Sequence, residues 1–222
     1  MPAKDAHAHA PSLREVFDRD ASPDARVRVE AHQPVYATGD EDDSMYLIES
    51  GQVKVSMSSA AGKDCLLAIY TAGDVFGESC FNGNERRIEN AIAMQASVVR
   101  RIPRRNFLAA IDRATATHSL ARHLSSRLTE REMAVFDLVT MPSERRLAKV
   151  LLEMAERLGG GNGDYLVLDH RVSHEELSQI VGTTRPRITA FLAKFRKLGL
   201  LERDGRIIKV HIARTREYVQ RD

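Results

Sequence analysis

The sequence predicts an α+β protein in which an N-terminal β-domain, a long helix and a C-terminal winged helix-turn-helix follow one another along the chain. Three observations predict this order. Short apolar runs alternate with glycine turns up to about Ile102, and an almost glycine-free helical stretch follows from about Pro103 to Thr140. After residue 142, helix caps and turn residues divide the chain into short helices that end in a hairpin.

The N-terminal part reads as a loose tail followed by short strands. The first 24 residues are rich in Ala, Asp, His and Pro, with one short helix expected around Leu13–Phe17. Val53, Val55 and Met57 then alternate with polar residues, which is the period of a half-buried strand. Glycine turns recur about every ten residues from Gly39 onward. Many short strands at this spacing predict a sandwich or a barrel.

The long helix carries one apolar stripe. A stripe on a helix of about 25 residues needs a partner surface. We favour the same helix of a second subunit, which would form a coiled-coil-like seam, while packing on the chain's own β-domain stays open as the alternative. The predicted dimer-interface residues are Leu120, Leu124, Leu128, Val135 and Leu138.

The C-terminal part begins where Met141-Pro142-Ser143 breaks the helix. A new amphipathic helix starts at Ser143 and is ended by the glycine cluster at 159–163, and a strand is expected at Tyr165–Leu168. Ser173 and Glu176 have the spacing of a capping box, which predicts a helix over Glu175–Val181 with Leu177 and Ile180 buried.

A second helix follows the turn glycine Gly182. We expect Thr183-Thr184 to cap it, Pro186 to lie in its first turn, and a buried face on its other side. That face is predicted to consist of Ile188, Phe191, Leu192 and Phe195. Asp204-Gly205 is a strong hairpin turn, so Leu200–Arg203 and Arg206–Ile212 are expected to form a wing, with Arg203, Arg206 and Lys209 near it.

This pair of helices is typical of DNA readers. The second helix of such a pair enters the major groove N-terminus first, where Arg185 and Arg187 could donate to guanine O6 and N7. Ser173, Thr183 and Thr184 could bind phosphates through hydroxyls and free helical N–H groups. The predicted DNA-binding residues are Ser173, His174, Thr183, Thr184, Arg185, Arg187 and Thr189.

Charge and composition agree with this interpretation. Residues 142–222 hold 16 basic and 11 acidic residues, whereas the preceding residues hold 17 and 20. The basic excess therefore lies beside the predicted reader, where it would neutralise phosphate. No apolar stretch approaches the length of a membrane helix and no signal peptide is apparent, so we expect a cytoplasmic protein without a membrane partner. Cys65 and Cys80 are too few for a zinc or iron–sulfur site, so no metal is predicted.

The pattern as a whole resembles the family of the cyclic-AMP receptor protein and the fumarate–nitrate regulator (CRP/FNR). The resemblance covers about residues 25–213 and is most specific at Glu175–Arg185, with Gly39-Asp40, Gly51-Gln52-Val53 and Gly73–Glu78 marking the β-domain. It implies a β-roll sensor domain, a dimerisation helix and a winged-helix reader. It also implies a homodimer that binds an inverted repeat in duplex DNA and contacts RNA polymerase.

The domain boundaries that we expect follow from this comparison. They are a tail at 1–24, a β-roll sensor domain at 25–115, a dimerisation helix at 116–140, a hinge at 141–143 and a DNA-binding domain at 144–222.

The resemblance carries over to the reader residue by residue. Arg185 matches the family arginine that reads a guanine. The family glutamate that accepts from cytosine falls on Pro186, and a second family arginine falls on Ala190. Because proline has no acceptor, we expect a palindromic site that differs from the family's best-known half-site, with Arg187 as a second reader.

The effector is the least determined feature. The resemblance implies candidate ligands of a cyclic nucleotide at Gly77, Glu78, Arg86, Arg87 and Arg131. Gly77-Glu78 match the family's ribose pair, and Arg87, with Arg86 beside it, matches its phosphate arginine. However, Ile88 replaces a hydroxyl residue, Glu89 adds a carboxylate, and Arg131-Glu132 replace the adenine-reading pair. These departures count against cyclic AMP, and no other cofactor is predicted.

Other sensing chemistries stay open at this point. A regulator without a ligand is one possibility, and a redox role for Cys80 is another, although a buried structural thiol is favoured. His118 and His123 are interpreted as solvated helix positions rather than haem ligands. No catalytic motif is present, so no catalytic residue and no enzyme are predicted. The alternative function is a ligand-binding module that acts through protein contacts instead of DNA.

Overall fold

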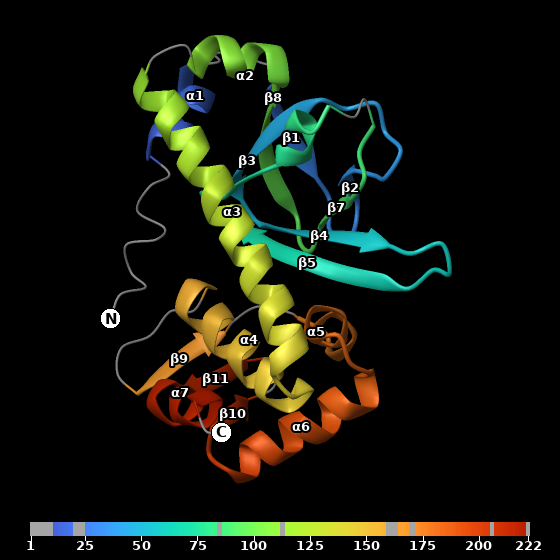
Figure 1. Cartoon of the computed structure of the whole chain (residues 1–222), viewed down its shortest axis with the longest axis vertical. Coiled ribbons are helices and arrows are strands. Elements are labelled where there is room, and N and C mark those ends of the chain that lie inside the picture. Colours follow the sequence, from blue (N-terminus) through green and yellow to red (C-terminus); the bar gives the residue numbers. More distant parts are fainter. Residues whose placement is uncertain are drawn as a thin grey trace. The chain divides into compact units, whose positions relative to one another are not determined.

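The computed structural model describes residues 11–19, 25–83, 86–111, 114–158, 164–168, 172–204 and 207–220. These residues form two compact units, which divide between Arg131 and Glu132, inside a long helix. Figure 1 labels the helices and strands of both units.

Two antiparallel four-stranded sheets form the first unit (Figure 1). One sheet has the order β1-β8-β3-β6, from Arg26–Val29, Ser97–Pro103, Ser44–Ser50 and Val75–Phe76. The other has the order β2-β7-β4-β5, from Pro34–Tyr36, Asn90–Ala93, Gln52–Ser58 and Asp64–Thr71. The prediction of an all-β domain built from short strands is confirmed.

The alternation predicted for β4 holds only in its first half. Val53 and Val55 are buried, but Met57 is 40% exposed and Ser56 is buried instead. A bulge between Val55 and Ser56 in the pairing with β5 causes this switch. A single extra residue moves every later side chain to the opposite face.

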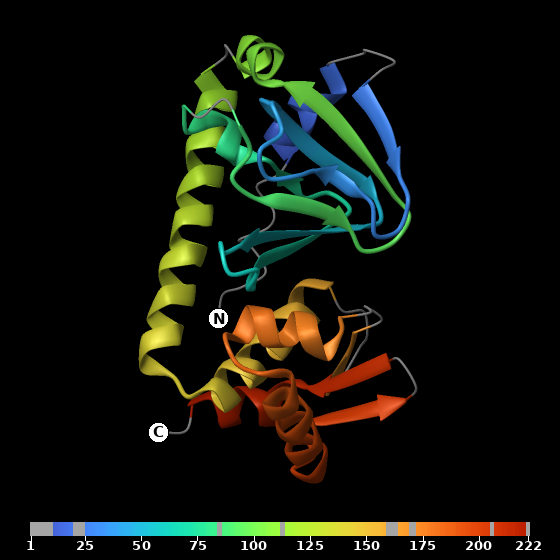
Figure 2. The same cartoon turned by 90° about the vertical axis from the view of Figure 1, so that its right-hand side faces the viewer.

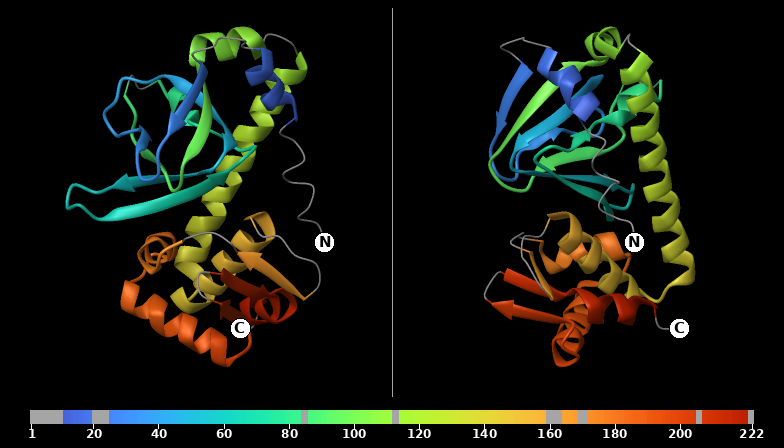
Figure 3. Two further views of the ribbon diagram at one scale, coloured as in Figure 1. Left: turned by 180° about the vertical axis from the view of Figure 1, so that it is seen from behind. Right: turned by 90° about the vertical axis from the view of Figure 1, so that its left-hand side faces the viewer.

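Aromatic side chains fill the space between the sheets. The rings of Tyr36, Tyr46 and Tyr70 all lie 5.2–6.2 Å from the ring of Phe76. A second core lies under two helices, α1 (Pro11–Arg19) and α2 (Arg104–Ile111), whose ribbons are visible in Figure 3. In this core Phe17 meets Phe107 edge to face at 5.8 Å. The short helix expected around Leu13–Phe17 is therefore present and is longer at both ends.

The long helix α3 spans Ala114–Thr140. Four of the five predicted interface residues are exposed in the single chain: Leu124 by 36%, Leu128 by 61%, Val135 by 61% and Leu138 by 54%. Leu120 differs, because it is partly buried against the core formed by α1 and α2. For that one residue, packing on the chain's own β-domain is the correct interpretation.

The second unit consists of the C-terminal part of α3, helices α4 to α7 and one three-stranded sheet (Figure 2). In order, the elements are α4 (Ser143–Leu158), β9 (Tyr165–Leu168), α5 (His174–Val181), α6 (Arg185–Lys197), β10 (Leu201–Asp204), β11 (Ile207–His211) and α7 (Ile212–Gln220). The sheet order β10-β11-β9 confirms the predicted strand and hairpin. Gly205 of the predicted turn, Arg206 at the predicted start of the second strand, and the glycine cluster at 159–163 lie outside the described residues.

Helix α7 was not predicted. Its sequence has few apolar residues and gives no clear helical stripe, and the hairpin was expected to extend to Ile212. Tertiary contacts hold it instead, since Thr215 is buried and donates from its hydroxyl to the Leu200 carbonyl at 3.2 Å.

Candidate nucleic-acid interface and ligand cavity

The first helix of the predicted pair begins with a complete capping box. The Ser173 Oγ accepts from the Glu176 N–H at 3.1 Å, and the Glu176 carboxylate accepts from the Ser173 N–H at 2.9 Å. These two bonds satisfy N–H groups that the helix cannot satisfy itself. The capping box is therefore confirmed, and the helix begins one residue earlier than predicted, at His174.

Gly182 makes the turn between the two helices. Its φ of 68° lies in the left-handed region that glycine adopts without strain. A Cβ added there would also lie 3.2 Å from the Leu138 Cδ1. Both observations explain why a glycine stands at this turn.

The buried face of α6 agrees with the prediction in three of its four residues. Ile188, Leu192 and Phe195 are buried, whereas Phe191 is only half-buried. On α5, Leu177 is buried as predicted, but Ile180 is half-buried and Val181 takes its place in the core.

Charged and polar side chains occupy the exposed N-terminal face of α6. Arg185, Arg187 and Thr189 are all exposed. The Arg187 guanidinium lies 5.6 Å from the ring of Phe191, within the range of a cation–π contact. Thr189 joins the two helices, since its Oγ1 lies 2.9 Å from the His174 Nδ1 and donates to the Arg185 carbonyl at 3.2 Å. This face can donate hydrogen bonds to base edges and phosphates.

The three predicted phosphate residues differ in what they can offer. Thr184 is exposed at the N-cap of α6, and its side chain makes no capping bond, so its hydroxyl is available. The Ser173 hydroxyl is already bonded to Glu176. The Thr183 Oγ1 is buried and has no hydrogen-bond partner among the described residues. Of the three hydroxyls, that of Thr184 is therefore the one that is both exposed and without a capping bond, while phosphate binding at Ser173 and Thr183 stays a prediction.

Two basic residues of α4 connect the helix-turn-helix to the end of α3, and sequence reasoning missed both. The Arg146 guanidinium donates to the carbonyls of Val181 at 3.0 Å and Leu138 at 3.2 Å. The Lys149 ammonium pairs with the Asp137 carboxylate. Met141 and Pro142 lie between α3 and α4, so the predicted hinge residues are spanned by these contacts.

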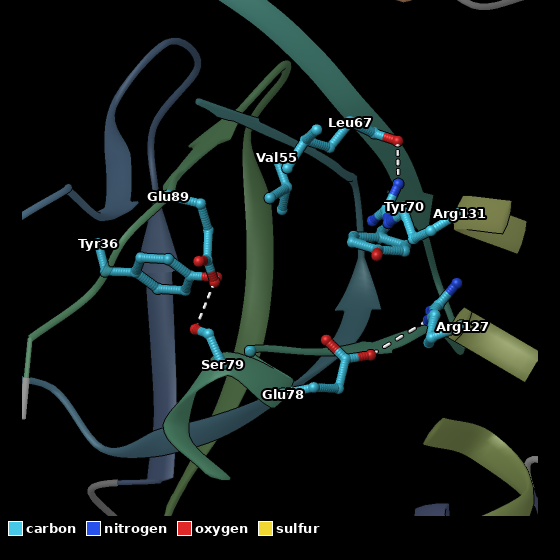
Figure 4. A pocket seen from close by; sticks show the side chains of 10 residues that line it. Tyr36, Val55, Leu67, Tyr70, Glu78, Ser79, Glu89, Arg127 and Arg131 are labelled. Atoms are coloured by element: carbon cyan, nitrogen blue, oxygen red, sulfur yellow. Dashed lines mark hydrogen bonds and ion pairs between the residues drawn. The ribbon is translucent and has the colours of Figure 1, made fainter. Parts of the chain in front are cut away.

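The first unit contains a cavity of about 190 Å³ between its sheets and α3 (Figure 4). Gly77, Glu78 and Arg131 line it, as the resemblance implied. The other lining residues are Tyr36, Val55, Leu67, Tyr70, Ser79, Glu89 and Arg127.

Glu78 is bonded to α3. Its Oε1 lies 2.7 Å from the His123 Nε2 and 3.1 Å from the Arg127 Nε. Burial alone would raise the pKa of Glu78, but the bond to His123 and the charge of Arg127 outweigh it and lower the pKa to about 2. His123 is therefore a half-buried partner of Glu78 and not a solvated helix position, and sequence reasoning missed Arg127 altogether.

The hydrogen-bond donors of Arg87 are all used in contacts within the protein. Its side chain is 1% exposed, and its five N–H groups meet five contacts with protein oxygens. Two go to the Asp42 carboxylate, two to the carbonyls of Gly77 and Ser44, and one to the Ser79 hydroxyl. Gly77 allows this approach, because a Cβ there would lie 2.9 Å from the Ser44 carbonyl and the residue's φ is 94°.

Arg86 and Arg87 are not in the cavity wall, unlike the remaining candidates. Arg86 is exposed and pairs with Glu41 at 2.5 Å, away from the lining residues. A cyclic phosphate is bound best by cations and hydroxyl donors. Arg127 and Arg131 line the cavity, but both already donate to protein oxygens. The Ser79 hydroxyl donates to the Glu89 carboxylate, which would repel a phosphate beside it, and Ile88 is 42% exposed. This part of the wall therefore does not fit a cyclic phosphate.

Cys80 is not placed to act as a reactive thiol. Burial raises the pKa of the Cys80 thiol to about 12, so the thiolate that redox chemistry needs is scarce. The interpretation of Cys80 as a buried thiol is confirmed, and Cys65 is exposed. In the described part of the chain, no cluster of His, Cys, Asp or Glu is arranged to hold a metal. None of the described helices has the length and apolar character needed to cross a bilayer.

Comparisons with known proteins agree with both units. Residues 26–114 match the model of the cyclic nucleotide-binding domain, and residues 145–216 match the Crp-like helix-turn-helix domain. A CRP-like cAMP-activated global transcriptional regulator of Mycobacterium tuberculosis is 31% identical over 179 residues, 79% of each chain. The cyclic AMP receptor protein of Thermus thermophilus is 28% identical over 171 residues, 76% of each chain.

Solved structures show the same fold. A CooA mutant from Carboxydothermus hydrogenoformans superposes with a TM-score of 0.76 at 23% identity, over 94% of this chain and 95% of that one. The two units thus define a transcription regulator with a helix-turn-helix DNA-binding domain. The chain belongs to the CRP/FNR family of transcription regulators.

Proposed function

We propose that this regulator acts as a homodimer that binds an inverted repeat in duplex DNA, with Arg185 and Arg187 reading base edges. The observation that carries this is the N-terminal face of α6, where both arginines and Thr189 are exposed beside the open hydroxyl of Thr184. An arginine can donate two hydrogen bonds to one guanine, and a helix N-terminus attracts a phosphate.

His174 belongs to the same surface as a positioning residue. Its bond to Thr189 fixes the start of α5 against the second turn of α6. Pro186 supplies no acceptor next to Arg185. We therefore propose that the protein has no preference for cytosine at the half-site position that the family glutamate reads.

The DNA proposal is tested by selecting bound sequences from a random duplex pool, followed by titrations at several salt concentrations. We expect an inverted repeat and a steep loss of affinity with salt. Arg185→Ala should relax the preference at one base pair and cost about 1–3 kcal/mol. Arg196→Ala, at the exposed C-terminal end of the same helix, is the matched control and should keep the preference.

Two outcomes would reject this assignment. Uniform weakening over all sequences in Arg185→Ala would make Arg185 a phosphate contact. Failure to enrich any sequence would favour the alternative of a module that acts through protein contacts.

The dimer proposal rests on the exposed leucines and valine of α3. Apolar side chains spaced along one helix are stabilised when a second helix covers them. Leu128→Glu should raise the dimer dissociation constant by at least about tenfold, measured by sedimentation equilibrium, because it places a charge in the seam. Leu108→Glu, which changes an exposed leucine of α2, should have no effect. A wild-type chain that sediments as a monomer at every concentration would refute the proposal.

We also propose that the β-roll cavity binds a small effector. The effector would change the arrangement of the two DNA-binding domains of the dimer, through α3 and the hinge at residues 141–143. An effector acts only through its differential affinity for two arrangements. Contact with RNA polymerase is part of the same proposal and rests on family membership alone.

A further inference from the structure

The wall of the cavity contains a buried carboxylate with an unused oxygen. Glu89 is 7% exposed, and its Oε1 accepts from the Tyr36 hydroxyl at 3.1 Å and from the Ser79 hydroxyl at 2.5 Å. Its Oε2 accepts no hydrogen bond from any described residue. Figure 4 shows the carboxylate beside Tyr36 and Ser79 on the cavity side. Because Glu89 lines the cavity and this oxygen accepts no hydrogen bond from the described residues, a ligand in the cavity can donate to it.

No cation of the wall neutralises Glu89 directly. Arg87 reaches it only through the Ser79 hydroxyl, which lies between the two side chains. Arg127 donates to Glu78 at 3.1 Å, to Glu130 at 3.0 Å and to the Val75 carbonyl at 3.1 Å. Arg131 donates to the Leu67 carbonyl at 2.5 Å, and Figure 4 shows it on the opposite side of the cavity from Glu89. The Glu89 carboxylate beside Ser79 therefore presents to the cavity a negative charge that is unpaired among the described residues.

The size of the cavity limits the ligand further. An apolar cavity of about 150 Å³ holds benzene, so the volume of about 190 Å³ suits one ring with a small polar group. Tyr36, Val55, Leu67 and Tyr70 supply apolar and aromatic wall for such a ring. A nucleoside phosphate, with its base, sugar and phosphate, belongs to the larger class of ligands that need at least about 300 Å³.

We propose that the cavity binds a small planar molecule with a hydrogen-bond-donating, protonated nitrogen group of the amidine or guanidine type, held by the Glu89 carboxylate. In this proposal, Glu89 is the residue that makes the cavity prefer ligands with nitrogen donors over cyclic phosphates. This inference rests on the proposal that the cavity takes an effector, and it names the chemistry of that effector.

The test uses three probes of one shape and different charge: benzamidine, benzamide and benzoate, with cyclic AMP as a fourth. Binding to the full chain is measured by isothermal titration calorimetry without DNA. We expect benzamidine to bind most tightly, at least about tenfold better than benzoate, because its amidinium can donate two charge-assisted bonds to the carboxylate. Cyclic AMP should bind more weakly than benzamidine.

Glu89→Gln is the informative variant. The glutamine oxygen can still accept from Tyr36 and Ser79, while its NH2 group presents a donor to the cavity where Oε2 presented an acceptor. The preference for benzamidine over benzoate should fall by at least about tenfold or reverse. Glu41→Gln, which changes an exposed carboxylate outside the cavity, should keep the wild-type order of affinities. Circular dichroism of both variants checks that they fold.

Each other outcome overturns the proposal. Tighter binding of cyclic AMP or benzoate than of benzamidine would reject a donor ligand, as would an unchanged order in Glu89→Gln. No binding of any probe up to 10-millimolar concentrations, on the order of the weakest measurable affinities, would reject the cavity as a site for a ring of this size. Because the assay contains no DNA, these failures are separate from a failure to select a DNA sequence.

Discussion

Replacing Arg87 by methionine should strongly destabilise the first unit, although the substitution leaves the volume of the side chain nearly unchanged. The change removes the donors for the carbonyls of Gly77 and Ser44 and breaks a buried ion pair with Asp42, whose side chain is 8% exposed. Removing one partner of a buried pair typically costs about 3–5 kcal/mol. Asp42 keeps its bonds to Arg101 at 3.0 Å and to the Tyr46 hydroxyl at 2.9 Å, so the cost should not exceed that range.

Urea unfolding measures this cost. Three of the five tyrosines, Tyr36, Tyr46 and Tyr70, lie in the first unit, so a change in the near-ultraviolet circular dichroism of tyrosine that Arg87→Met shifts and Arg86→Met does not is assigned to that unit. With a slope of about 2 kcal/mol per molar urea, the midpoint should fall by about 2 M. Arg86→Met is the control on the neighbouring residue. Its side chain and that of its partner Glu41 are 64% and 71% exposed, so the change should cost less than about 1 kcal/mol.

The comparison of the two variants can refute the reasoning. If Arg87→Met cost no more than Arg86→Met, the five contacts of Arg87 would not stabilise the fold. Arg87 would then be free to serve as an anion ligand, and the argument against a cyclic phosphate would lose its main support.

Three further predictions concern single contacts. The pKa of Glu78 is lowered from 4.5 to about 2, so its ionised form contributes about 3 kcal/mol to the free energy of unfolding above pH 4.5. That contribution is lost as the pH falls toward 2. In urea titrations between pH 5 and 3, Glu78→Gln should therefore make the stability less dependent on pH. Ser173→Ala should cost about 1 kcal/mol of unfolding free energy, and Glu176→Gln clearly less, because glutamine also completes a capping box. Gly182→Ala should cost about 1 kcal/mol or more and lower the melting temperature, since alanine is strained at a φ of 68°; an unchanged melting temperature would contradict this.

The parts of the fold that the sequence predicts well are those fixed by neighbouring residues. The capping box at Ser173 and the left-handed turn at Gly182 depend on residues only a few positions apart, and both are present as expected. The hairpin of β10 and β11 is recognisable from its turn residues for the same reason. Helix α7 lacks such a local signal, because its position depends on contacts such as that of Thr215 with Leu200.

The cavity was predicted less well, because its chemistry depends on residues far apart in the chain. Glu78 and Glu89 are close to each other in the sequence, but the residues that contact them and decide their roles lie far away in the sequence. His123 and Arg127 come from α3, 45 and 49 positions after Glu78, and Tyr36 lies 53 positions before Glu89. A motif can show that Arg87 occupies the position of a phosphate ligand. Only the fold shows that Asp42 and Ser44 have already taken its hydrogen-bond donors.

These contacts distinguish two ways in which a ligand could act on α3. A ligand that takes the Glu78 Oε1 for itself would displace the bonds from His123 and Arg127, and so loosen α3 from the β-roll. A ligand held by the open oxygen of Glu89 leaves those bonds intact and adds contacts to the same wall. Because a ligand shifts an equilibrium only toward the arrangement that it binds better, the first kind would favour a released α3 and the second a retained one. If Glu89 holds the ligand, as we propose, the expected signal is therefore a retained α3, whereas a ligand that displaces the partners of Glu78 would give the opposite signal.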